Sequence, residues 1–512
     1  MSAGRDITSA PPRMMRWIAS SDAFYVSIAA TVFFFYFSIV VMFPRSLLGD
    51  ADTLWHIRTG QWILDHAQVP TVDFYSYTAV GTRWISTEWL SEILFALSFK
   101  IGGWHGVVIL SALACAAIVA IICFYLVRNL RFSVAIGWTA LTALAISPHF
   151  LARPHLFAYI VESIWVIKLL ESYDRGDFRS SIPSFCLLMV LWANLHPSFT
   201  FGLALFYIVV GYSCCAKFFQ REYLRCKDEF FAVIAVSVCA LLTPYGIFSA
   251  LLTLEVMNAK VGIQYVAEWL PPNYQQNRIF LFLIVGFLMA VTSLGVRLRG
   301  PRLIAYGMVL ILGLSYARGL AIFYLLTPII FARPVSDCGP GLGAQPKCVQ
   351  CSQPTVAVTS LDPVLLFLQK RSIMIPVICL VGAILVTAVF WRPMGLGPPD
   401  SVAPKAAVDF VEKAGITGNV FNSYNFGGYL IFRGIPTFVD GRQPPYADKF
   451  LQEYYDTIKL RDSVRAFQLL DRYKVEWVLL LPEEPLAKSL AERNQWNNVY
   501  SDKDAVVFVR SR

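Results

Sequence analysis

A short segment after the first long apolar run is rich in side chains that exchange protons or bind cations. Its sequence, SLLGDADTLWHIRTGQWILDHAQVPTVDFYSYT (residues 46–78), contains four aspartates, two histidines and one arginine. Carboxylates act as general bases, and pairs of carboxylates hold divalent cations. Because the apolar run 23–43 directly precedes it, the segment is either a solvated loop or a reaction site at a membrane surface.

Asp50 and Asp52 form the closest acidic pair in this segment. If the chain turns into a helix here, the two carboxylates crowd one end of it, and like charges raise one pKa toward the range that suits a general base. Asp52 stands beside Thr53 at the start of a helical pattern, so it is equally suited to cap that helix. The pattern gives Asp50 no capping role, which makes it the stronger candidate for chemistry.

The composition predicts the class of protein that must position this pair. Hydrophobic residues make up 56% of the 512 residues and charged residues only 15%, whereas soluble domains carry about 25% charged residues. We therefore predict a polytopic α-helical membrane protein, with about eleven transmembrane helices and a small C-terminal α/β domain. The net charge of +9 fits basic cytoplasmic loops that set orientation, so nucleic acid is not an expected partner.

The distribution of basic residues predicts the topology. Three arginines precede the first apolar run, which is too long for a signal peptide and has no small-residue cleavage site behind it, so the N-terminus is expected in the cytoplasm. Eleven spans then place every strongly basic loop inside. The short segment 87–103 is interrupted by Glu88, Glu92 and Lys100, so we expect it to lie flat on the outer surface as an interfacial helix.

This topology divides the chain into three parts. They are a cytoplasmic N-terminus (1–22), a transmembrane domain (23–391) that includes the first outer loop (44–103) and a cytoplasmic loop (334–372), and an extracytoplasmic α/β domain (392–512). The polar side chains gather on the outer side, where all six histidines fall: His56, His66, His105, His149, His155 and His196. Arg153, Asn194 and Glu268 fall there as well.

Arg153 precedes Pro154 at the start of a predicted span. It is therefore expected at the edge of the bilayer, where a guanidinium can bind a phosphate through two parallel hydrogen bonds. The alternative is that it anchors the helix on ordinary lipid headgroups.

Beyond Pro404 the apolar runs shorten to the length of strands. GNVFN, PTFVD, WVLLLP and AVVFVR predict strands, and SVRAFQLLDRYK and EPLAKSLAERN predict helices between them. This alternation favours a small α/β domain. Its segments NSYNFGGYLIFRG and VDGRQPPY contain glycines that form turns for reasons of backbone geometry alone.

Several blocks of the sequence together resemble the GT-C superfamily of membrane glycosyltransferases. The blocks are DADTLWHIRTGQWIL, VPTVDFYSYT, TEWLSE, ARPH, WANLHPS, EWLPP and NFGGYLIF with a later FVDGR, and they cover nearly the whole chain. The similarity is to a bacterial group related to the protein O-mannosyltransferases and aminoarabinose transferases. It implies a GT-C-like multi-pass protein of the bacterial inner (plasma) membrane, with the C-terminal domain in the periplasm or outside the cell.

The resemblance also implies a function. An inverting glycosyltransferase of this kind would move a sugar from a polyprenyl-phosphate carrier to an envelope acceptor, which could be a glycan, a lipid or a protein. The base of the GT-C pattern is an acidic residue just after the first helix, which corresponds to Asp50. The further expected site residues are Asp52 as a second catalytic carboxylate; Arg153, His155, His196 and Arg58 at the donor phosphate; His56, Asp73, Glu88, Asn194 and Glu268 in supporting positions; and Tyr424, Asn425, Asp440 and Arg442 at the acceptor.

No cofactor is firmly expected. The DAD sequence resembles the acidic pairs that hold Mg²⁺ or Mn²⁺ in other glycosyltransferases, but Asp-x-Asp is a weak motif, and a lipid monophosphate leaves less charge to neutralise than a nucleotide diphosphate does. Cys338, Cys348 and Cys351 fall in the predicted cytoplasmic loop. One Cys-x-x-Cys with a single further cysteine is short of a four-ligand zinc site.

Two other classes of function remain as alternatives. A flippase or transporter of lipid-linked sugars would carry charged residues within its spans and show inverted repeats, whereas the polar residues here cluster at one surface. A non-catalytic envelope scaffold would tolerate loss of the acidic pair, and both aspartates are present. Transfer of a sugar without net movement of its carrier across the membrane would separate an enzyme from a flippase.

Overall fold

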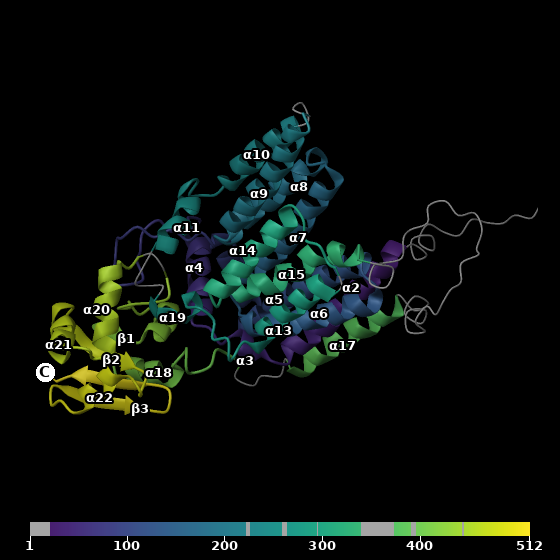
Figure 1. Cartoon of the computed structure of the whole chain (residues 1–512). Coiled ribbons are helices and arrows are strands. Elements are labelled where there is room, and N and C mark those ends of the chain that lie inside the picture. The colour runs from purple at the N-terminus through teal and green to yellow at the C-terminus, as the bar shows by residue number, and fades with distance from the viewer. Residues whose placement is uncertain are drawn as a thin grey trace, which may run out of the picture.

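The computed structural model describes residues 21–221, 226–258, 264–293, 295–338, 373–390, 396–442 and 445–511. Most of the predicted cytoplasmic N-terminus and of the predicted cytoplasmic loop, including Cys348 and Cys351, lies outside these residues. The described part consists of a bundle of apolar helices and a smaller C-terminal unit built on a sheet (Figure 1).

The bundle is built from helices separated by short connections. They are α2 (Ser21–Val41), α5 (Trp89–Asn129), α6 (Phe132–Ile146), α7 (His155–Arg175), α8 (Ile182–Leu195), α9 (Phe199–Phe219), α10 (Lys227–Ala240), α11 (Phe248–Asn258), α13 (Arg278–Ser293), α14 (Pro301–Ser315), α15 (Gly319–Ser336) and α17 (Met374–Phe390). Within the described residues, five stretches are long and apolar enough to cross a membrane: Asp22–Val41, Trp89–Asn129, Phe132–His149, Phe199–Phe219 and Gly319–Ser336. The protein therefore has several helices that can span a bilayer, while the number eleven and the orientation stay predictions.

Helix α5 is the central element of the bundle, because it packs against α2, α4, α6, α7 and α15. Its backbone leaves the helical conformation at Gly103, where φ is 56° and ψ is −141°, a region that glycine adopts far more readily than other residues. The break lies where the sequence predicted the end of a surface helix and the start of a span. The two predicted segments are therefore two parts of one kinked element.

The first outer loop folds onto the start of α5. It contains α3 (Pro44–Leu47) and α4 (Asp52–His66), followed by an irregular segment with an isolated bridge between Val72 and Arg83. Helix α4 packs closely on α5, since a β-carbon placed on Gly60 would lie 2.0 Å from the carbonyl oxygen of Glu92. Glycine at this position thus brings the two backbones, and the polar residues on them, into direct contact.

The C-terminal unit is an α/β domain with one four-stranded sheet. Its strands are β1 (Asn419–Asn422), β2 (Val475–Leu480), β3 (Trp496–Ser501) and β4 (Val506–Arg510), in the spatial order β1-β2-β4-β3. β1 and β2 are parallel, and β4 is antiparallel to both β2 and β3. The helices of the domain are α18 (Lys405–Lys413), α19 (Gly427–Arg433), α20 (Asp448–Ile458), α21 (Ser463–Arg472) and α22 (Pro485–Ala491).

Three of the four predicted strands and both predicted helices of this domain are present. The fourth predicted strand, PTFVD (436–440), is not part of the sheet, and β3 takes the edge position instead. Thr437 pairs with the first outer loop, because its amide donates to the Tyr75 carbonyl at 3.1 Å and its carbonyl accepts from the Tyr77 amide at 3.1 Å. The apolar pattern of this segment therefore serves an interface between the two parts of the chain.

The α/β domain is docked on the first outer loop and on α5. Helix α19 packs against α4, and a β-carbon placed on Gly428 would lie 2.2 Å from the Ala51 carbonyl oxygen. Phe432 lies against both Phe99 and Trp104, with ring centroids 5.6 and 5.8 Å apart. In Figure 1 the yellow strands lie beside the bundle, on the side where α4 and α19 meet.

Candidate active site

Arg153 is bound by three carboxylates, two from the start of α4 and one from the loop after α11. Its Nη1 donates to Asp50 Oδ2 at 3.2 Å and to Glu268 Oε1 at 2.6 Å, and its Nη2 donates to Asp52 Oδ2. The four side chains are between 16% and 36% exposed, so a ligand can reach them. Three acids around one guanidinium leave the cluster with net negative charge when all are ionised.

Asp50 and Asp52 have different backbone roles from those that the sequence predicted. Asp52 is the first residue of α4 and does not cap it; the capping position belongs to Ala51, whose side chain makes no cap. The carboxylate that serves the helix start is that of Asp50, because its Oδ1 accepts the Asp52 amide at 2.7 Å. The capping prediction for Asp52 is therefore wrong, and the oxygen of Asp50 that remains for chemistry is Oδ2.

Asp52 lies at the junction of the two parts of the chain. Its Oδ1 accepts the Trp55 indole N–H at 2.9 Å, and a β-carbon placed on Gly441 would lie 2.1 Å from that oxygen. Burial raises the pKa of Asp52 to about 7, although the Arg153 guanidinium opposes the rise. A carboxyl with this pKa changes its charge near neutral pH, as general bases and their immediate partners do.

The loop before α7 and the loop after α11 supply the other two members of the cluster. The residue before Arg153 is fixed to the first outer loop, since the Ala152 amide donates to Leu47 O at 2.8 Å and the Thr53 hydroxyl donates to Ala152 O at 2.9 Å. Glu268 belongs to a short 3₁₀ turn (Ala267–Trp269). The Arg153 guanidinium lowers the pKa of Glu268 to about 2, so Glu268 is ionised at every physiological pH.

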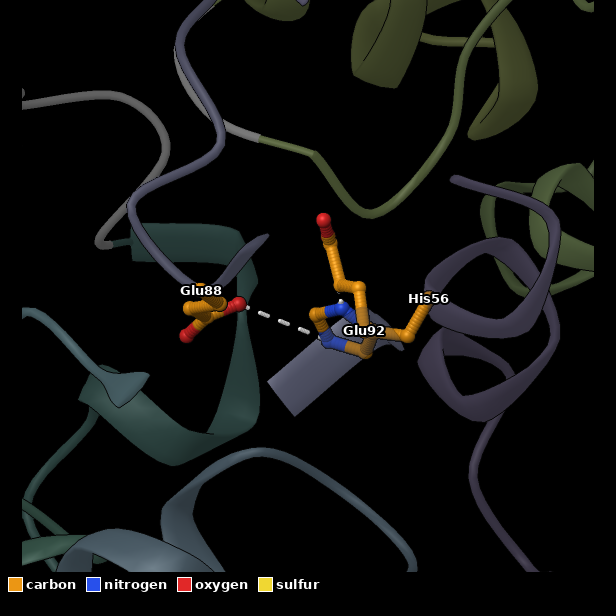
Figure 2. Close-up of side chains that lie close together, drawn as sticks. All are labelled: His56, Glu88 and Glu92. Atoms are coloured by element: carbon orange, nitrogen blue, oxygen red, sulfur yellow. Dashed lines mark hydrogen bonds and ion pairs between the residues drawn. The ribbon is translucent and has the colours of Figure 1, made fainter. Parts of the chain in front are cut away.

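A second polar cluster lies beside the first and is almost closed to solvent. His56 stands between two glutamates, with Nδ1 3.2 Å from Glu92 Oε1 and Nε2 3.6 Å from Glu88 Oε2 (Figure 2). Glu88 Oε1 is also 3.3 Å from His196 Nε2. The Ser86 hydroxyl holds the other Glu92 oxygen at 2.7 Å. The four titratable groups thus form a continuous row from α5 to the end of α8.

Burial sets the charge of this row. It lowers the pKa of His56 and of His196 well below the usual value. The Arg153 guanidinium lowers both pKa values further, and Arg318 also lowers that of His196. Burial raises the pKa of Glu88 to about 7. Both imidazoles are therefore neutral, and Glu88 exchanges its proton near neutral pH. For His196 the Ser198 amide donates to Nδ1 at 3.1 Å, which places the ring proton on Nε2, facing Glu88.

The second cluster also has the spacing of metal ligands. One ligand atom each from His56, Glu88 and Glu92 lies within 4.8 Å of the other two, and imidazole nitrogen with carboxylate oxygen is a donor set that suits zinc. In the first cluster Arg153 already contacts all three carboxylates, so a divalent ion bound by Asp50, Asp52 and Glu268 would have to displace the guanidinium. The residues of the second cluster could hold a metal ion, whereas a Mg²⁺ or Mn²⁺ site at the aspartate pair stays a prediction.

The remaining candidates in the helical bundle and the first outer loop differ in their contacts. His155 starts α7, two residues after Arg153, and its Nε2 lies 3.0 Å from the His149 carbonyl oxygen. Arg58 is on the exposed face of α4, within 3.5 Å of Gln61 Oε1, and makes no described contact with the carboxylate cluster. Asn194 has a structural set of partners, since it accepts from Trp89 Nε1 and donates to the carbonyls of Val190 and Leu242.

Asp440 and Arg442 lie in a buried ionic network at the interface between the domains. Both side chains are closed to solvent, and Arg442 Nη1 donates to Asp73 Oδ1 at 2.6 Å while its Nε donates to Asp440 Oδ1 at 2.8 Å. The guanidinium lies over the rings of Tyr75 and Trp84, 4.9 and 4.6 Å from their centroids. In this conformation neither side chain is open to an acceptor, so contact with one stays a prediction.

Tyr424 and Asn425, the other two acceptor candidates, are more accessible. They begin the 3₁₀ turn Tyr424–Phe426, one residue after the end of β1. Tyr424 is partly exposed and Asn425 is exposed. Arg318 is a further cation close to the carboxylate cluster, since its guanidinium lies 4.7 Å from the Trp269 ring centroid and its amide donates to the Glu268 carbonyl. Its position at the start of α15, far from DAD along the chain, gave no signal of this proximity.

Comparisons with known proteins agree at the level of the fold. No protein-family model and no curated protein matches the sequence. Among solved structures, the chain is similar to the Archaeoglobus fulgidus oligosaccharyltransferase tethered with an acceptor peptide, with a TM-score of 0.52 and 10% identity over 91% of this chain and 69% of that one. It is also similar to the archaeal oligosaccharyltransferase AglB from the same organism in complex with an inhibitory peptide and a dolichol-phosphate, with a TM-score of 0.54, 10% identity and coverages of 91% and 70%.

A third similar structure is ArnT from Cupriavidus metallidurans in the apo state, with a TM-score of 0.49 and 14% identity over 97% of this chain and 98% of that one. The oligosaccharyltransferases have the fold of the GT-C superfamily, and this chain has that fold as well. The class of fold that the sequence blocks predicted is thereby confirmed.

Proposed function

We propose that the protein is a glycosyltransferase that moves a sugar from a polyprenyl-phosphate carrier to an acceptor at the outer face of the bacterial inner membrane. The observation that carries the proposal is the cluster in which Asp50, Asp52 and Glu268 share the guanidinium of Arg153. It combines, in one accessible place, proton acceptors and a cation with the geometry to bind phosphate. The GT-C fold and the dolichol-phosphate complex of a similar structure support the choice of donor.

The proposed reaction uses these groups as follows. The acceptor hydroxyl loses its proton to Asp50 Oδ2 while its oxygen attacks the anomeric carbon of the donor. The bond from that carbon to the phosphate oxygen breaks, and the carrier leaves as a phosphate whose added charge is neutralised by Arg153. Attack from the side opposite the phosphate inverts the anomeric configuration.

Asp50 suits the role of base better than Asp52. The contact of Asp50 Oδ2 with the guanidinium, at 3.2 Å, is the longest of the three, so it is the first to be released when Arg153 turns to a phosphate. Both carboxylates are held on both oxygens, but the contact of Asp52 with Arg153 is shorter, and the indole N–H of Trp55 holds its other oxygen. We assign Asp52 and Glu268 the role of holding Arg153 in place.

An apolar cavity beside the second cluster supplies room for the carrier lipid. Its volume is about 390 Å³, and it lies between the start of α5 and the ends of α8 and α10, where its lining residue Trp89 directly follows Glu88 in the chain. Its lining residues are Trp89, Leu90, Leu187, Val190, Leu191, Asn194, Leu242, Thr243 and Pro244. Most of them are apolar, as a site for an isoprenoid tail requires.

One observation favours the alternative of a lipid-linked sugar transporter. Glu162, in the middle of α7, is fully buried, and neither carboxylate oxygen has a hydrogen-bond partner among the described residues. Ionisable residues within spans mark substrate or proton pathways in transporters. In vesicles that contain the purified protein, transfer of a labelled sugar without movement of the carrier between leaflets would support the enzyme over the transporter.

The proposed function can be tested in the host by deletion and complementation. Deletion of the gene should remove a sugar from an envelope glycan, lipid or protein, detected by mass spectrometry. The wild-type gene should restore it, and Asp50→Asn should not, because loss of a general base lowers rates by about 10² to 10⁴-fold. Asp65→Asn is the matched control, since Asp65 is an exposed carboxylate on α4. Full restoration by Asp50→Asn at equal protein levels would refute the assignment.

A further inference from the structure

The α/β domain contains a cavity that the proposed reaction does not use. Its volume is about 310 Å³, at the lower end of the range of about 300 to 1,000 Å³ that small-molecule pockets cover. It is lined by residues that follow β1 and β2 and by residues of α20, among them Ser423, Tyr424, Asn425, Tyr455, Glu483 and Glu484. A ligand the size of one or two sugar rings fits such a space.

The cavity lies at the place where α/β sheets bind ligands. Ser423 directly follows β1, and Leu481 directly follows β2, so both segments leave the carboxyl ends of two adjacent parallel strands. Ligands of open α/β sheets bind outside these ends, because the loops there diverge and leave a crevice. The position of the cavity is therefore that of a binding site.

Aromatic rings form one side of the cavity. Tyr455 and Tyr424 lie with their ring centroids 6.3 Å apart, and Tyr455 is stacked on Tyr265 at 4.0 Å with an interplanar angle of 16°. Tyr265 comes from the loop that also carries Glu268. The apolar C–H face of a pyranose packs on such rings, while the phenol hydroxyls offer hydrogen bonds at the rim.

The polar groups of the cavity are acidic or neutral, with a single cation. Glu484 Oε2 is held by the Ser423 hydroxyl at 2.5 Å and by the Leu481 amide at 3.2 Å, and burial raises the pKa of Glu484 to about 7. The Lys459 ammonium lies over the Tyr265 ring, 4.7 Å from its centroid. Two glutamates against one lysine disfavour a phosphate or another anion, and they suit hydroxyl or amino groups.

The cavity is close to the carboxylate cluster along two connections. Tyr265 and Glu268 are three residues apart on one loop, so the Tyr265–Tyr455 stack and the Glu268–Arg153 ion pair link the same loop to both places. In addition, the turn that holds Tyr424 and Asn425 continues into α19. Gly428 of α19 lies against Ala51, the residue between the two aspartates. A chain of sugar units bound in the cavity can thus extend to the base.

We propose that this cavity binds a neutral or amino-bearing saccharide unit of the acceptor, so that the acceptor is a glycan. The inference rests on the proposed function, since it names the acceptor class of that reaction. A protein acceptor would instead be recognised through its peptide chain, and it becomes an outcome of the test.

Binding of the full-length protein in nanodiscs to printed arrays tests the proposal. One array should hold bacterial and other polysaccharide fragments, and the other should hold peptides with serine and threonine. We expect selective binding to a group of glycans and none to peptides. Asn425→Trp, which fills the mouth of the cavity, and Glu483→Gln should each weaken glycan binding at least tenfold. Asn497→Trp, an equally exposed position on β3, should leave it unchanged, and thermal unfolding should show that all variants fold.

Each outcome of this experiment decides the proposal. Binding to peptides alone, no binding to any glycan, or glycan binding that both cavity variants retain would overturn it. If the wild type binds these glycans through the cavity but transfers no sugar, the proposed function fails while the saccharide site stands.

Discussion

Arg153 is the residue around which the candidate site is organised. The sequence allowed Asp50, Asp52, Arg153 and Glu268 to be chosen as candidates, because each is a charged residue next to an apolar run. It could not show that one guanidinium joins them, since its partners lie 101 to 115 residues away along the chain. The sequence also predicted a cap by Asp52, whereas the carboxylate that accepts a backbone amide at the start of α4 is that of Asp50. A hydrogen bond from an aspartate to the amide two residues ahead and an N-cap give similar sequence patterns.

The raised pKa of Asp52 predicts the pH dependence of transfer. The carboxyl is mostly protonated below its pKa of about 7, and only its ionised form holds Arg153 firmly. Transfer should therefore increase from pH 6 to pH 8, by roughly tenfold for a single group of this pKa. Initial rates with saturating donor would measure this acid limb.

Variants can show which carboxyl group causes the increase of the transfer rate between pH 6 and pH 8. Asp52→Asn should lower the rate at pH 8 and abolish the increase, because the amide cannot ionise. Glu88 has a similar pKa of about 7, so Glu88→Gln is the necessary comparison and should keep the limb. The assignment to Asp52 is wrong if the increase survives in Asp52→Asn and disappears in Glu88→Gln.

At the scale of elements, local patterns predicted most of the α/β domain. Strands β1, β2 and β4 and helices α21 and α22 followed from periodicity and turn residues. β3 (Trp496–Ser501) has mostly exposed side chains, so its sequence WNNVYS lacks the apolar alternation of a half-buried strand. Segment 436–440 (PTFVD) has the aromatic and β-branched residues of a strand, but it pairs with the first outer loop. The Thr78–Phe438 hydrogen bond, for example, joins residues that are 360 positions apart in the chain. No local pattern can identify a partner at such a distance.

Two glycines allow the α/β domain to approach the candidate base, and replacing one of them should disrupt the site. A methyl group at Gly441 would lie 2.1 Å from Asp52 Oδ1, so Gly441→Ala must push the carboxylate or the domain aside. We expect transfer to fall at least tenfold, since small misplacements of reacting groups cost about 10²-fold. Gly211→Ala is the control, because a β-carbon there meets no atom within 4 Å. Equal activity of Gly441→Ala and the wild type would show that this contact does not position Asp52.

At the scale of the whole molecule, composition alone predicted the class. A chain with 56% hydrophobic residues can bury so many apolar side chains only in a bilayer or a very large core, and the described helices include several long enough to cross a membrane. The docking of the two parts was beyond prediction, because it depends on shape at Gly428, Gly441 and Phe432. Sequence patterns report which face of an element is apolar, but not which distant surface covers it.

The predicted topology can be checked with reporter fusions. Alkaline phosphatase fused after Ser511 should be active and green fluorescent protein at the same site should be dark, because the C-terminal domain is expected outside the cytoplasm. Fusions within residues 176–178, in the loop between α7 and α8, should behave in the opposite way, because the proposed topology places this basic loop inside. A fluorescent C-terminal fusion would place the α/β domain inside and exclude a reaction at the outer face.

The contact between the α/β domain and the first outer loop has a consequence for biogenesis. Asp73 and Arg442 are 369 residues apart, yet they form one buried ion pair, and Gly441 lies against Asp52, two residues after the proposed base. The first outer loop therefore lacks its final neighbours until almost the entire polypeptide has been translated. A nascent chain that stalls or is truncated before this point carries both aspartates and still lacks a finished reaction centre.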